Sequence, residues 1–514
     1  MCQTRENEEH RIEIYPVPEC YREVKDIRIR VNGEHLPLIA CNEQYDYCHF
    51  SFSGRADIEI CVGEAICFEQ ISPLAKEIPS EVRGDTLAFS LTCPQYLIVK
   101  INRNKELIVA ADPLEQDAPP ACGEGIYNVA EKPYGADPHG RLDATAAIQA
   151  AISDAAEKGG GIVYVPAGVF SVANLVLKSN VHLYLCGGAV LREKETPEGL
   201  SKDFTKHGIS GKICDYPGTW MVRTEAYSEN IRIYGRGTID ANGTHLRTEY
   251  RFLTTVVACH QCRNFSTEGV IIRDGGLWSF LLIRSRDIQV TGTKHFNEVD
   301  SIYENDAIDV LESQNVRICH TIAVAEDDTY SLKAYGEGSG DIKASWVGSP
   351  GRNRDVVFDD CFAWTRCGAF KIGWGVFSDM CHITFRNSYV YSCMTGVNMT
   401  HYSGTGAAED ITYENIDIES FRSKSDRDRR CMWLIADIVD RGGGAGSIRD
   451  VAVRNIRVRK PEGLPCVIKG YDENAFIDRL LLENIELCGR KIRSLKDLDL
   501  AEAPKFAENI TVRG

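Results

Sequence analysis

Short alternating runs of apolar and polar residues recur along most of this chain. The commonest are variants of a four-residue unit, Asn or Asp, then Ile or Val, any residue, and Ile or Val. Most neighbouring copies lie about 23 to 40 residues apart, within the repeat length of a β-solenoid. The pattern predicts a parallel β-helix in which Asn side chains at stacked turns bond to backbone groups. Copies begin at Asn230, Asn264, Asp287, Asn315, Asp355, Asp410, Asp450 and Asn509.

Residues 10 to 112 carry a different pattern and are predicted to form a separate all-β domain. Asp26–Val31 and Asp57–Val62 alternate polar and apolar residues, which is the period of a half-buried strand. Tyr96–Ala110 is predicted to form a hairpin around a short polar segment. A β-sandwich is expected, acting as a cap or packing platform, with carbohydrate binding as the alternative. A proline-containing linker leads to the predicted β-helix domain, residues 120 to 514.

One helix is predicted near the start of the second domain. Within Ala144–Lys158 apolar residues recur at helical spacing, Asp143 precedes the segment as a candidate N-cap, and Gly159–Gly161 ends it. A short amphipathic helix can plug the open end of a β-helix, where unpaired strand edges otherwise invite aggregation. The expected fold is all-β: an N-terminal β-sandwich followed by a parallel β-helix with one capping helix.

Length, charge and hydropathy narrow the classes of partner. A chain of 514 residues is too long to fold around one ordinary hydrophobic core, so two domains, or one domain and a solenoid, are expected. Lys and Arg total 58 against 74 Asp and Glu, a net charge of -16 that argues against nucleic acid. No long apolar run predicts a membrane span, and the first residues lack the apolar stretch of a secretory signal. A cytoplasmic protein without a membrane partner is expected.

The cysteines are numerous but scattered. There are 20 of them, spread over the whole chain, and we interpret most as buried thiols of a reducing compartment. Cys259 and Cys262 form the only Cys-x-x-Cys sequence, with no second pair at zinc-site spacing. A structural role for this pair is favoured over metal or redox chemistry. No metal and no cofactor are expected.

The candidate chemistry lies between Val299 and Tyr335, where Asp306, Asp327 and Asp328 stand among β-branched runs. Asp306 and Asp327 are 21 residues apart, about one coil of a solenoid. Coils stack about 4.8 Å apart, so with a lateral offset the two carboxylates can reach the roughly 6.5 to 9.5 Å that leaves room for a water between an acid and a base. Clustered carboxylates also raise one another's pKa, which helps one of them to stay protonated.

Two further expectations concern aspartates: the first is about their orientation, and the second is about their place in turns. Consecutive residues of a regular strand point to opposite faces, so Asp327 and Asp328 share a cleft only if the strand ends or bulges there. Asp309, Asp355 and Asp410 are interpreted as turn residues of the solenoid. The same interpretation of the three candidate aspartates is the structural alternative to catalysis.

The segment resembles the polygalacturonase group, glycoside hydrolase family 28, whose signatures are Asn-Thr-Asp, Asp-Asp, Gly-His-Gly and Arg-Ile-Lys. Glu304–Asp309 stands where the first signature falls, and Glu326–Lys333 matches the Asp-Asp segment. Cys367–Trp374 occupies the third region without its histidine, and Gly396–Thr400 the fourth without its arginine or lysine. In the family the basic signature faces the carboxylate of the substrate, so its absence here implies a neutral sugar.

Phe370–Trp374 also resembles the corresponding part of the dextranase group, glycoside hydrolase family 49, which shares the β-helix, three comparable aspartates and a preceding β-sandwich. The resemblance covers roughly residues 120 to 510 and implies that the β-helix is right-handed. By position it implies Asp327 as the general acid of an inverting hydrolysis, with Asp306 and Asp328 holding and activating the water.

Substrate contacts are expected from cations and large aromatic residues on the same and later coils. Lys333 either bonds to the substrate or neutralises the aspartates. The tryptophans either stack on a sugar face or fill the core. The candidates are Lys333, Lys371, Trp374, Trp278, Trp346, His401 and Tyr402.

Three functions from different classes follow. The first is a hydrolase of α-linked, neutral oligosaccharides, for which a cytoplasmic address favours short imported chains. The second is a uronate-active enzyme, either a polygalacturonase or a lyase or epimerase; the last two need calcium or basic residues against the carboxylate, and no such cluster is evident. The third is a carbohydrate-binding solenoid without catalysis.

Overall fold

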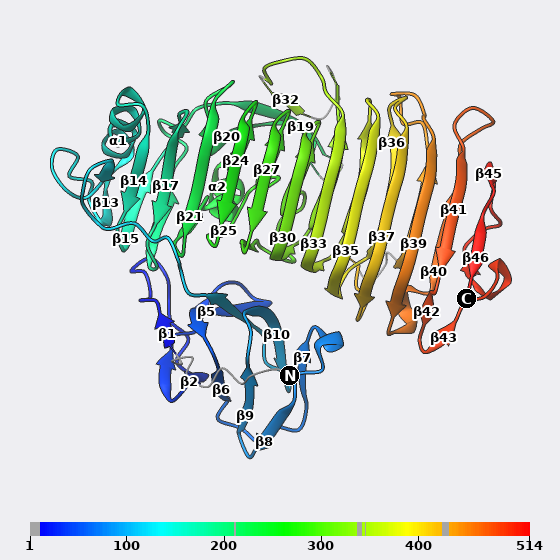
Figure 1. The fold of residues 1–514 in the computed structure, drawn as a ribbon, viewed down its shortest axis with the longest axis horizontal. Coiled ribbons are helices and arrows are strands. Elements are labelled where there is room, and N and C mark those ends of the chain that lie inside the picture. Colours follow the sequence, from blue (N-terminus) through cyan, green and yellow to red (C-terminus); the bar gives the residue numbers. More distant parts are fainter. Residues whose placement is uncertain (1–10, 210–211, 337–341, 345, 424–430) are drawn as a thin grey trace, which may run out of the picture.

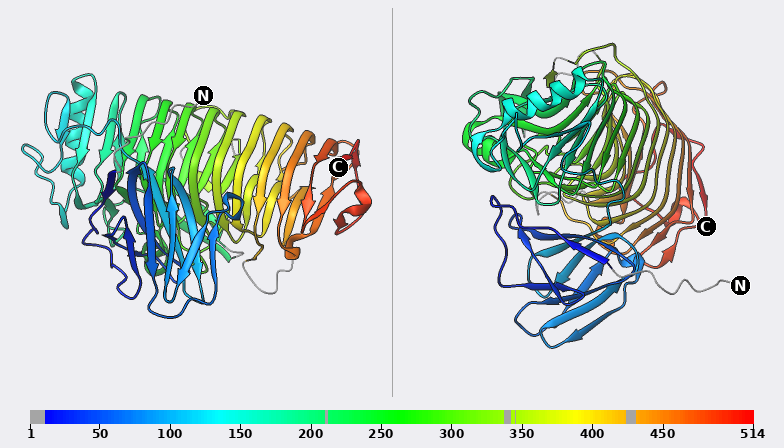
Figure 2. Two further views of the ribbon diagram at one scale, coloured as in Figure 1. Left: turned by 60° about the horizontal axis from the view of Figure 1, so that its bottom comes forward. Right: turned by 60° about the vertical axis from the view of Figure 1, so that its left-hand side comes forward.

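The computed structural model describes residues 11–209, 212–336, 342–344, 346–423 and 431–514. The chain forms a long β-solenoid with a smaller β-domain packed against it (Figure 1). Figure 2 shows this smaller domain, drawn in blue, lying alongside the coils rather than over either end. The all-β fold with an N-terminal sandwich and a parallel β-helix is confirmed.

Two long sheets run the length of the β-helix. In the described part of the chain one has 22 strands, beginning at β12 (Ile126–Asn128), and the other has 13, ending at β44 (Asp499–Leu500). Neighbouring coils pair in parallel, as β37 (Ala408–Ile418) does with β39 (Ile448–Val458). Apolar residues of both sheets meet in one continuous core inside the coils.

Aromatic side chains in this core stack from coil to coil. The ring centroids of Phe358 and Phe385 are 4.7 Å apart, and those of Phe385 and Tyr413 are 4.8 Å apart. Both distances equal the spacing of neighbouring strands, about 4.8 Å, so each ring repeats the position of the previous one. This stacking explains why the same apolar positions recur in each copy of the sequence unit.

The repeated asparagines also stack, as predicted, but their partners differ from the expected backbone groups. Asn387, Asn415, Asn455 and Asn484 occupy successive coils with positive φ angles. Each later side chain donates from Nδ2 to Oδ1 of the one before it, at 2.7 to 2.9 Å. Asn tolerates this left-handed backbone better than other side chains, and the amide carries both a donor and an acceptor. A ladder of side-chain amides therefore forms along these positive-φ positions of successive coils.

The predicted capping helix is α1 (Thr145–Glu157), which covers the first coils (Figure 1). Ala144 rather than Asp143 is its N-cap residue, a correction to the prediction, although the Asp143 carboxylate still accepts the backbone N–H of Thr145 at 2.9 Å. A second helix, α2 (Gly243–Tyr250), was not expected. Its sequence is polar and begins at an Asn-Gly pair, so it carries no apolar stripe of the kind that predicts a helix.

The N-terminal domain consists of two sheets of six and five strands among the described residues. The predicted hairpin is present as β10 (Gln95–Ile101) and β11 (Glu106–Pro113), which pair antiparallel. Strand β11 also pairs with β5 (Tyr45–Ser53), in parallel. Apolar side chains of the two sheets form a core separate from that of the β-helix.

A third apolar cluster joins this domain to the side of the β-helix. Tyr45 and Ile98 from the domain pack with Phe296 and Trp364 from the coils. The buried carboxylate of Asp112 lies in the same interface and accepts hydrogen bonds from His49, Tyr96 and Lys294. A buried ion pair with several hydrogen bonds fixes the relative orientation of its two partners, because a rotated arrangement leaves charges unpaired.

Two expectations from composition concern cysteines and membranes. All 18 cysteines whose side chains are described are free thiols, but only six of them, including Cys259 and Cys262, are buried, so the expectation that most are buried was wrong. Among the described residues these two belong to no group of three potential metal ligands. Over the same residues, neither helix has the length and apolar character needed to cross a bilayer.

One buried carboxyl makes the stability of the coils pH-dependent. Glu193 ends β18 (Ala189–Glu193) and is 1% exposed, and burial raises its pKa to about 8. Its unfolded pKa is about 4.3, so between about pH 4.3 and pH 8 the folded protein binds more protons than the unfolded chain. Stability contributed by the protonated form is therefore lost as pH rises through this window, by about 1.4 kcal/mol per unit.

We expect Glu193→Gln to remove this pH dependence, because glutamine keeps the shape and cannot ionise. The measurement is denaturant unfolding of both proteins between about pH 5 and about pH 8.5. The free energy of unfolding of Glu193→Gln should exceed that of wild type by an amount that grows as the pH rises. Glu195→Gln, at a carboxylate that is 68% exposed, is the control and should show a flat difference. Parallel curves for wild type and Glu193→Gln would show that Glu193 is ionised in the fold.

Candidate active site

A cavity of about 450 Å³ lies on the outer face of the 13-stranded sheet. It is built from successive coils, beginning at Trp278 before β26 (Phe280–Ile283) and reaching Ile435 on β38 (Met432–Ile438). Eight of the ten candidate residues line this cavity. They are Asp306, Asp327, Asp328, Lys333, Lys371, Trp374, Trp278 and Tyr402.

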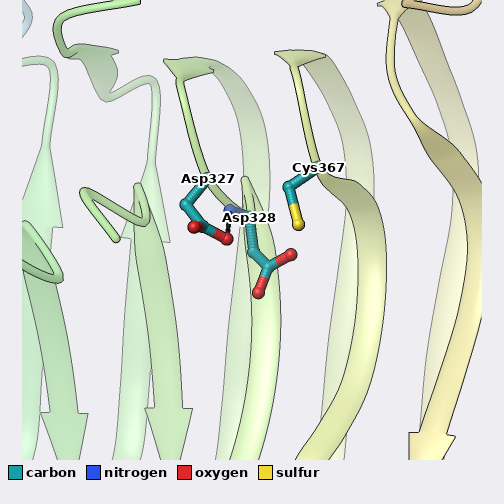
Figure 3. Close-up of side chains that lie close together, drawn as sticks. All are labelled: Asp327, Asp328 and Cys367. Atoms are coloured by element: carbon teal, nitrogen blue, oxygen red, sulfur yellow. Dashed lines mark hydrogen bonds between the residues drawn. The ribbon is translucent and has the colours of Figure 1, made fainter. Parts of the chain in front are cut away.

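Asp327 and Asp328 lie at the bend between β30 (Gln314–Ala325) and β31 (Tyr330–Ala334). Because they are outside regular strand, the alternation of faces does not apply, and both carboxylates line the cavity (Figure 3). The Asp327 carboxylate accepts the backbone N–H of Asp328 at 3.1 Å and that of Glu304 at 3.1 Å. The strand ending that the hypothesis required is therefore present.

Asp306 lies one coil earlier, two residues before β29 (Ile308–Leu311). Ile308 pairs with Tyr330, so Asp306 is level with Asp328 rather than with Asp327. The backbone confirms this register, since the N–H of Ala307 donates to the carbonyl of Asp328 at 2.9 Å. The local coil is thus 22 residues long, one more than the spacing considered from the sequence.

Lys333 holds two carboxylates at once. Its Nζ donates to Asp306 at 2.5 Å and to Asp309 at 2.5 Å, and all three side chains are buried. Burial raises the pKa of Asp306 well above its usual range; Lys333 opposes this shift, and the charges of Asp309, Asp327 and Asp328 add to it. The pKa of Asp309 is also raised by burial. The turn interpretation of Asp309 was therefore wrong: it lies within β29 and belongs to the charged cluster.

Asp355 and Asp410 are exposed and have positive φ angles, as expected of turn residues, but they lie within the strands β33 (Asn353–Thr365) and β37. Asp309 differs because its strand neighbours Ile308 and Val310 point into the core, which directs its own side chain outward to the cavity side.

Asp328 is held by a second lysine. Its Oδ2 accepts Lys371 Nζ at 2.6 Å, and its Oδ1 accepts the backbone N–H of Gly368 at 3.0 Å. Burial lowers the pKa of Lys371, but the charges of Asp328, Cys367 and Asp327 together outweigh it and the net shift is upward. A Cβ at position 368 would lie 2.8 Å from Asp328 Oδ1 and 3.3 Å from Lys371 Cδ. The absence of a side chain at Gly368 therefore leaves room for this ion pair.

The far wall of the cavity is aromatic. Trp374 is 44% exposed and its ring centroid lies 5.5 Å from that of Tyr402. The Arg441 guanidinium carbon lies 4.5 Å from the Trp374 centroid and 4.4 Å from that of Tyr402. On the opposite side, Trp278 stacks with Tyr335 and lies 4.2 Å from Lys333 Nζ. The cavity thus has a charged floor between two aromatic walls.

Asp327, Asp328 and Cys367 form the one group of three potential metal ligands among the described residues (Figure 3). One ligand atom from each lies within 4.8 Å of the others. The Lys371 ammonium already contacts Asp328 at 2.6 Å, and its charge repels a metal ion at the same carboxylate. The donor set therefore does not favour a metal.

Solved structures share this architecture. A family 28 exopolygalacturonase of Yersinia enterocolitica aligns over 99% of this chain and 94% of its own, with a TM-score of 0.59 and 17% identity. Dex49A of Penicillium minioluteum aligns over 97% of this chain and 96% of its own, with a TM-score of 0.56 and 10% identity. The fold is a right-handed parallel β-helix. At such low identity, these alignments establish the fold alone.

Sequence comparisons match shorter segments. A family model described as rhamnogalacturonase A/epimerase, pectate lyase-like, matches residues 126–272. This segment ends before the cavity lining, which begins at Trp278. Mannuronan C5-epimerase AlgE1 of Azotobacter vinelandii is 48% identical over 130 residues, which are 23% of this chain. The matched part spans only 8% of that relative's length.

Two candidate residues lie outside the cavity. The Arg284 guanidinium carbon lies 5.7 Å from the ring centroid of Trp346, which packs against the apolar cluster that includes Trp278 but does not itself line the cavity. His401 is 1% exposed, and its Nε2 donates to the carbonyl of Gly406 at 2.8 Å. On β36 (Thr395–Ser403) His401 has the parity of the core residues, whereas its neighbour Tyr402 faces the cavity. Direct substrate contact by Trp346 or His401 is therefore corrected to a structural role.

Several lining residues were not predicted from the sequence, among them Asn398, Thr400 and Arg441. Asn398 and Thr400 had a usable signal, because they alternate with Val397 and Met399 on a strand whose coil follows that of Lys371. Arg441 had none: it follows β38 in a segment of irregular structure, where the N–H of Arg441 donates to the Tyr402 carbonyl at 3.0 Å.

Proposed function

We propose that this protein is a glycoside hydrolase that cleaves α-linked oligosaccharides. The observation that carries the proposal is the meeting of Asp306, Asp327 and Asp328, from two successive coils, in one cavity with aromatic walls. Its volume, about 450 Å³, falls in the range of roughly 300 to 1,000 Å³ typical of small-molecule sites. Clustered carboxylates beside aromatic surface suit acid and base catalysis on a sugar.

Asp327 is assigned as the general acid and donates its proton to the glycosidic oxygen as the bond from that oxygen to the anomeric carbon breaks. It is the least buried of the three carboxyls, so it is the one best placed to reach a leaving group. A water then adds to the opposite face of the sugar and loses its proton to the base, which inverts the anomeric configuration. Asp328, with its two hydrogen-bond donors, is assigned as base, and Asp306 helps to hold the water.

A neutral substrate is supported by the state of the cations. Lys333 is bound to Asp306 and Asp309, and Lys371 to Asp328, so the charge of each ammonium is already balanced by a buried carboxylate. A uronate beside them brings a further negative charge close to these carboxylates, which repel it. A cytoplasmic location, which is also part of this proposal, favours short chains over polymer.

The test is a product screen against neutral α-gluco- and α-galacto-oligosaccharides beside oligogalacturonides. We expect cleavage of a neutral oligosaccharide, with the β-anomer as the first product in a time-resolved proton NMR spectrum. Retention of the α-anomer would overturn the inverting mechanism. Ultraviolet absorbance of an unsaturated uronate would show a lyase instead, and binding without turnover would favour a carbohydrate-binding solenoid.

A polygalacturonase is the second candidate, and one observation favours it. Arg441 lines the cavity, and within the described part of the chain its guanidinium packs against the rings of Trp374 and Tyr402 and forms no ion pair. Such a guanidinium can bind a substrate carboxylate in bidentate fashion.

Arg441→Gln separates the two candidates. For a neutral substrate we expect less than a threefold change in kcat/KM relative to wild type, while a uronate substrate should lose roughly tenfold or more, since a hydrogen bond between charged groups is worth about 1.5 to 3 kcal/mol. Arg457→Gln, on β39 in the other sheet, is the matched control and should leave both substrates unaffected. A large loss of kcat/KM on a neutral sugar would contradict the role of Arg441 in binding a substrate carboxylate.

A further inference from the structure

Strand β36 presents two small polar side chains to the cavity. Asn398 and Thr400 alternate with Val397 and Met399, which point into the core. Both line the cavity, yet each is only 4% exposed. Asn398 is aligned with Lys371 on the neighbouring strand. Asn398 and Thr400 therefore lie one coil beyond the ion pair of Lys371 with Asp328.

Each of these side chains keeps one buried polar atom without a hydrogen-bond partner in the described protein. Asn398 Nδ2 donates to Thr395 Oγ1 at 2.6 Å, which orients the amide and leaves Oδ1 as the unpaired atom. Thr400 Oγ1 is unpaired as well. A buried polar group left unmatched destabilises a fold, so such atoms in a binding cavity point to a ligand that supplies the missing partners.

We propose that Asn398 and Thr400 are specificity-determining residues that bind two hydroxyl groups of a neutral sugar unit next to the cleaved bond. This inference rests on the proposed function and names the substrate groups that the same cavity binds. Asn398 Oδ1 accepts from one hydroxyl, and Thr400 Oγ1 pairs with another. Residues two apart on a strand are roughly 6.6 Å apart, so the two atoms reach separate hydroxyls rather than sharing one.

The Oδ1 atom of Asn398 selects against an anion at its position. A carboxylate can only accept hydrogen bonds, so it meets the Asn398 Oδ1 lone pairs with no proton between them. A sugar hydroxyl can both donate and accept, and it satisfies either atom. The exposed face of Trp374, on the preceding coil, offers an apolar surface for the ring of the same sugar unit.

The test compares substrates that differ by one hydroxyl. Isomaltotriose, maltotriose and their single-position deoxy derivatives are assayed with wild type, Asn398→Leu and Thr400→Val. For the parent sugar that wild type cleaves, we expect each variant to lose roughly 10- to 100-fold in kcat/KM. For wild type, removing the matching hydroxyl from the substrate should lower kcat/KM by a similar factor. For the variant, removing the same hydroxyl should lower kcat/KM little further. Thr412→Val, on β37 in the other sheet, is the control.

Binding to Asp327→Asn, measured by titration calorimetry with the same sugars, separates this inference from the proposed function. Turnover by wild type with unchanged deoxy discrimination in both variants would overturn the inference alone. Binding that shows the discrimination, without turnover by wild type, would support the inference and overturn the hydrolase. Absence of both binding and turnover for every sugar tested would overturn both. Asn398→Asp adds a check on orientation: retained affinity for the neutral sugar supports an accepting Oδ1, and a loss equal to that of Asn398→Leu contradicts it.

Discussion

Asp327→Asn is expected to lower kcat for an α-linked oligosaccharide by roughly 10²- to 10⁴-fold, the usual contribution of a general acid. The amide cannot give a proton to the glycosidic oxygen. It still accepts one of the two backbone N–H groups, from Asp328 and Glu304, that the carboxylate binds. We therefore expect a thermal midpoint close to that of wild type and a large loss confined to kcat.

The leaving group provides the decisive readout for this variant. An α-aryl glycoside with an activated phenol needs little protonation, so Asp327→Asn should lose far less on it than on the oligosaccharide. Asp410→Asn, at an exposed position of β37 with a positive φ angle, is the matched control and should be fully active on both. Equal losses on both substrates would mean that Asp327 positions the substrate and that another group is the acid. Full activity of Asp327→Asn would remove the residue from the mechanism.

The repeat pattern was enough to predict the β-helix because each coil makes the same demand on its sequence. Residues such as Phe358, Phe385 and Tyr413 must fill one interior row, while Asn415 and Asn455 must share one row of positive-φ positions. These are local, periodic requirements, and a sequence displays them directly. The side of the helix on which the N-terminal domain docks depends instead on Asp112 meeting Lys294, 182 residues later, and no periodicity records such a contact.

The candidate site was predicted as far as local motifs extend. Asp327 and Asp328 share the cavity because the chain bends there, a feature that the sequence allowed without requiring. Strand parity would have excluded His401 and admitted Asn398, since the core residues Val397 and Met399 fix the inward positions of β36. Asp309 was misassigned because its partner, Lys333, lies 24 residues later in the sequence. The two side chains meet only because β29 and β31 pair in neighbouring coils.

Lys333→Met should have the largest effect on stability, because it leaves Asp306 and Asp309 buried without a cation. Removing one member of a buried ion pair costs about 3 to 5 kcal/mol. Lys333 is 3% exposed and serves two carboxylates, so water cannot replace it without opening the floor of the cavity. Activity should fall as well, since Asp306 then binds a proton that the water-holding role requires it to release.

The pH dependence of this loss has a definite sign. Burial already raises the pKa of Asp306 and Asp309, and Lys333 is the main charge that opposes the shift. Without it both pKa values rise further, so the folded variant binds more protons than its unfolded chain above about pH 4, and stability is lost as pH rises. We expect the deficit against wild type, measured by denaturant unfolding, to be larger at about pH 8 than at about pH 5.

Two comparisons decide whether charge burial is the cause. Lys469→Met removes an exposed partner of Glu502 and should cost no more than about 1 kcal/mol at either pH. Adding Asp309→Asn to Lys333→Met removes one of the two stranded carboxylates, so the double variant should regain part of the lost stability and much of the pH dependence should disappear. A single Lys333→Met variant as stable as Lys469→Met at alkaline pH would mean that the two aspartates are neutral in the native protein, and that Lys333 is free to bind substrate.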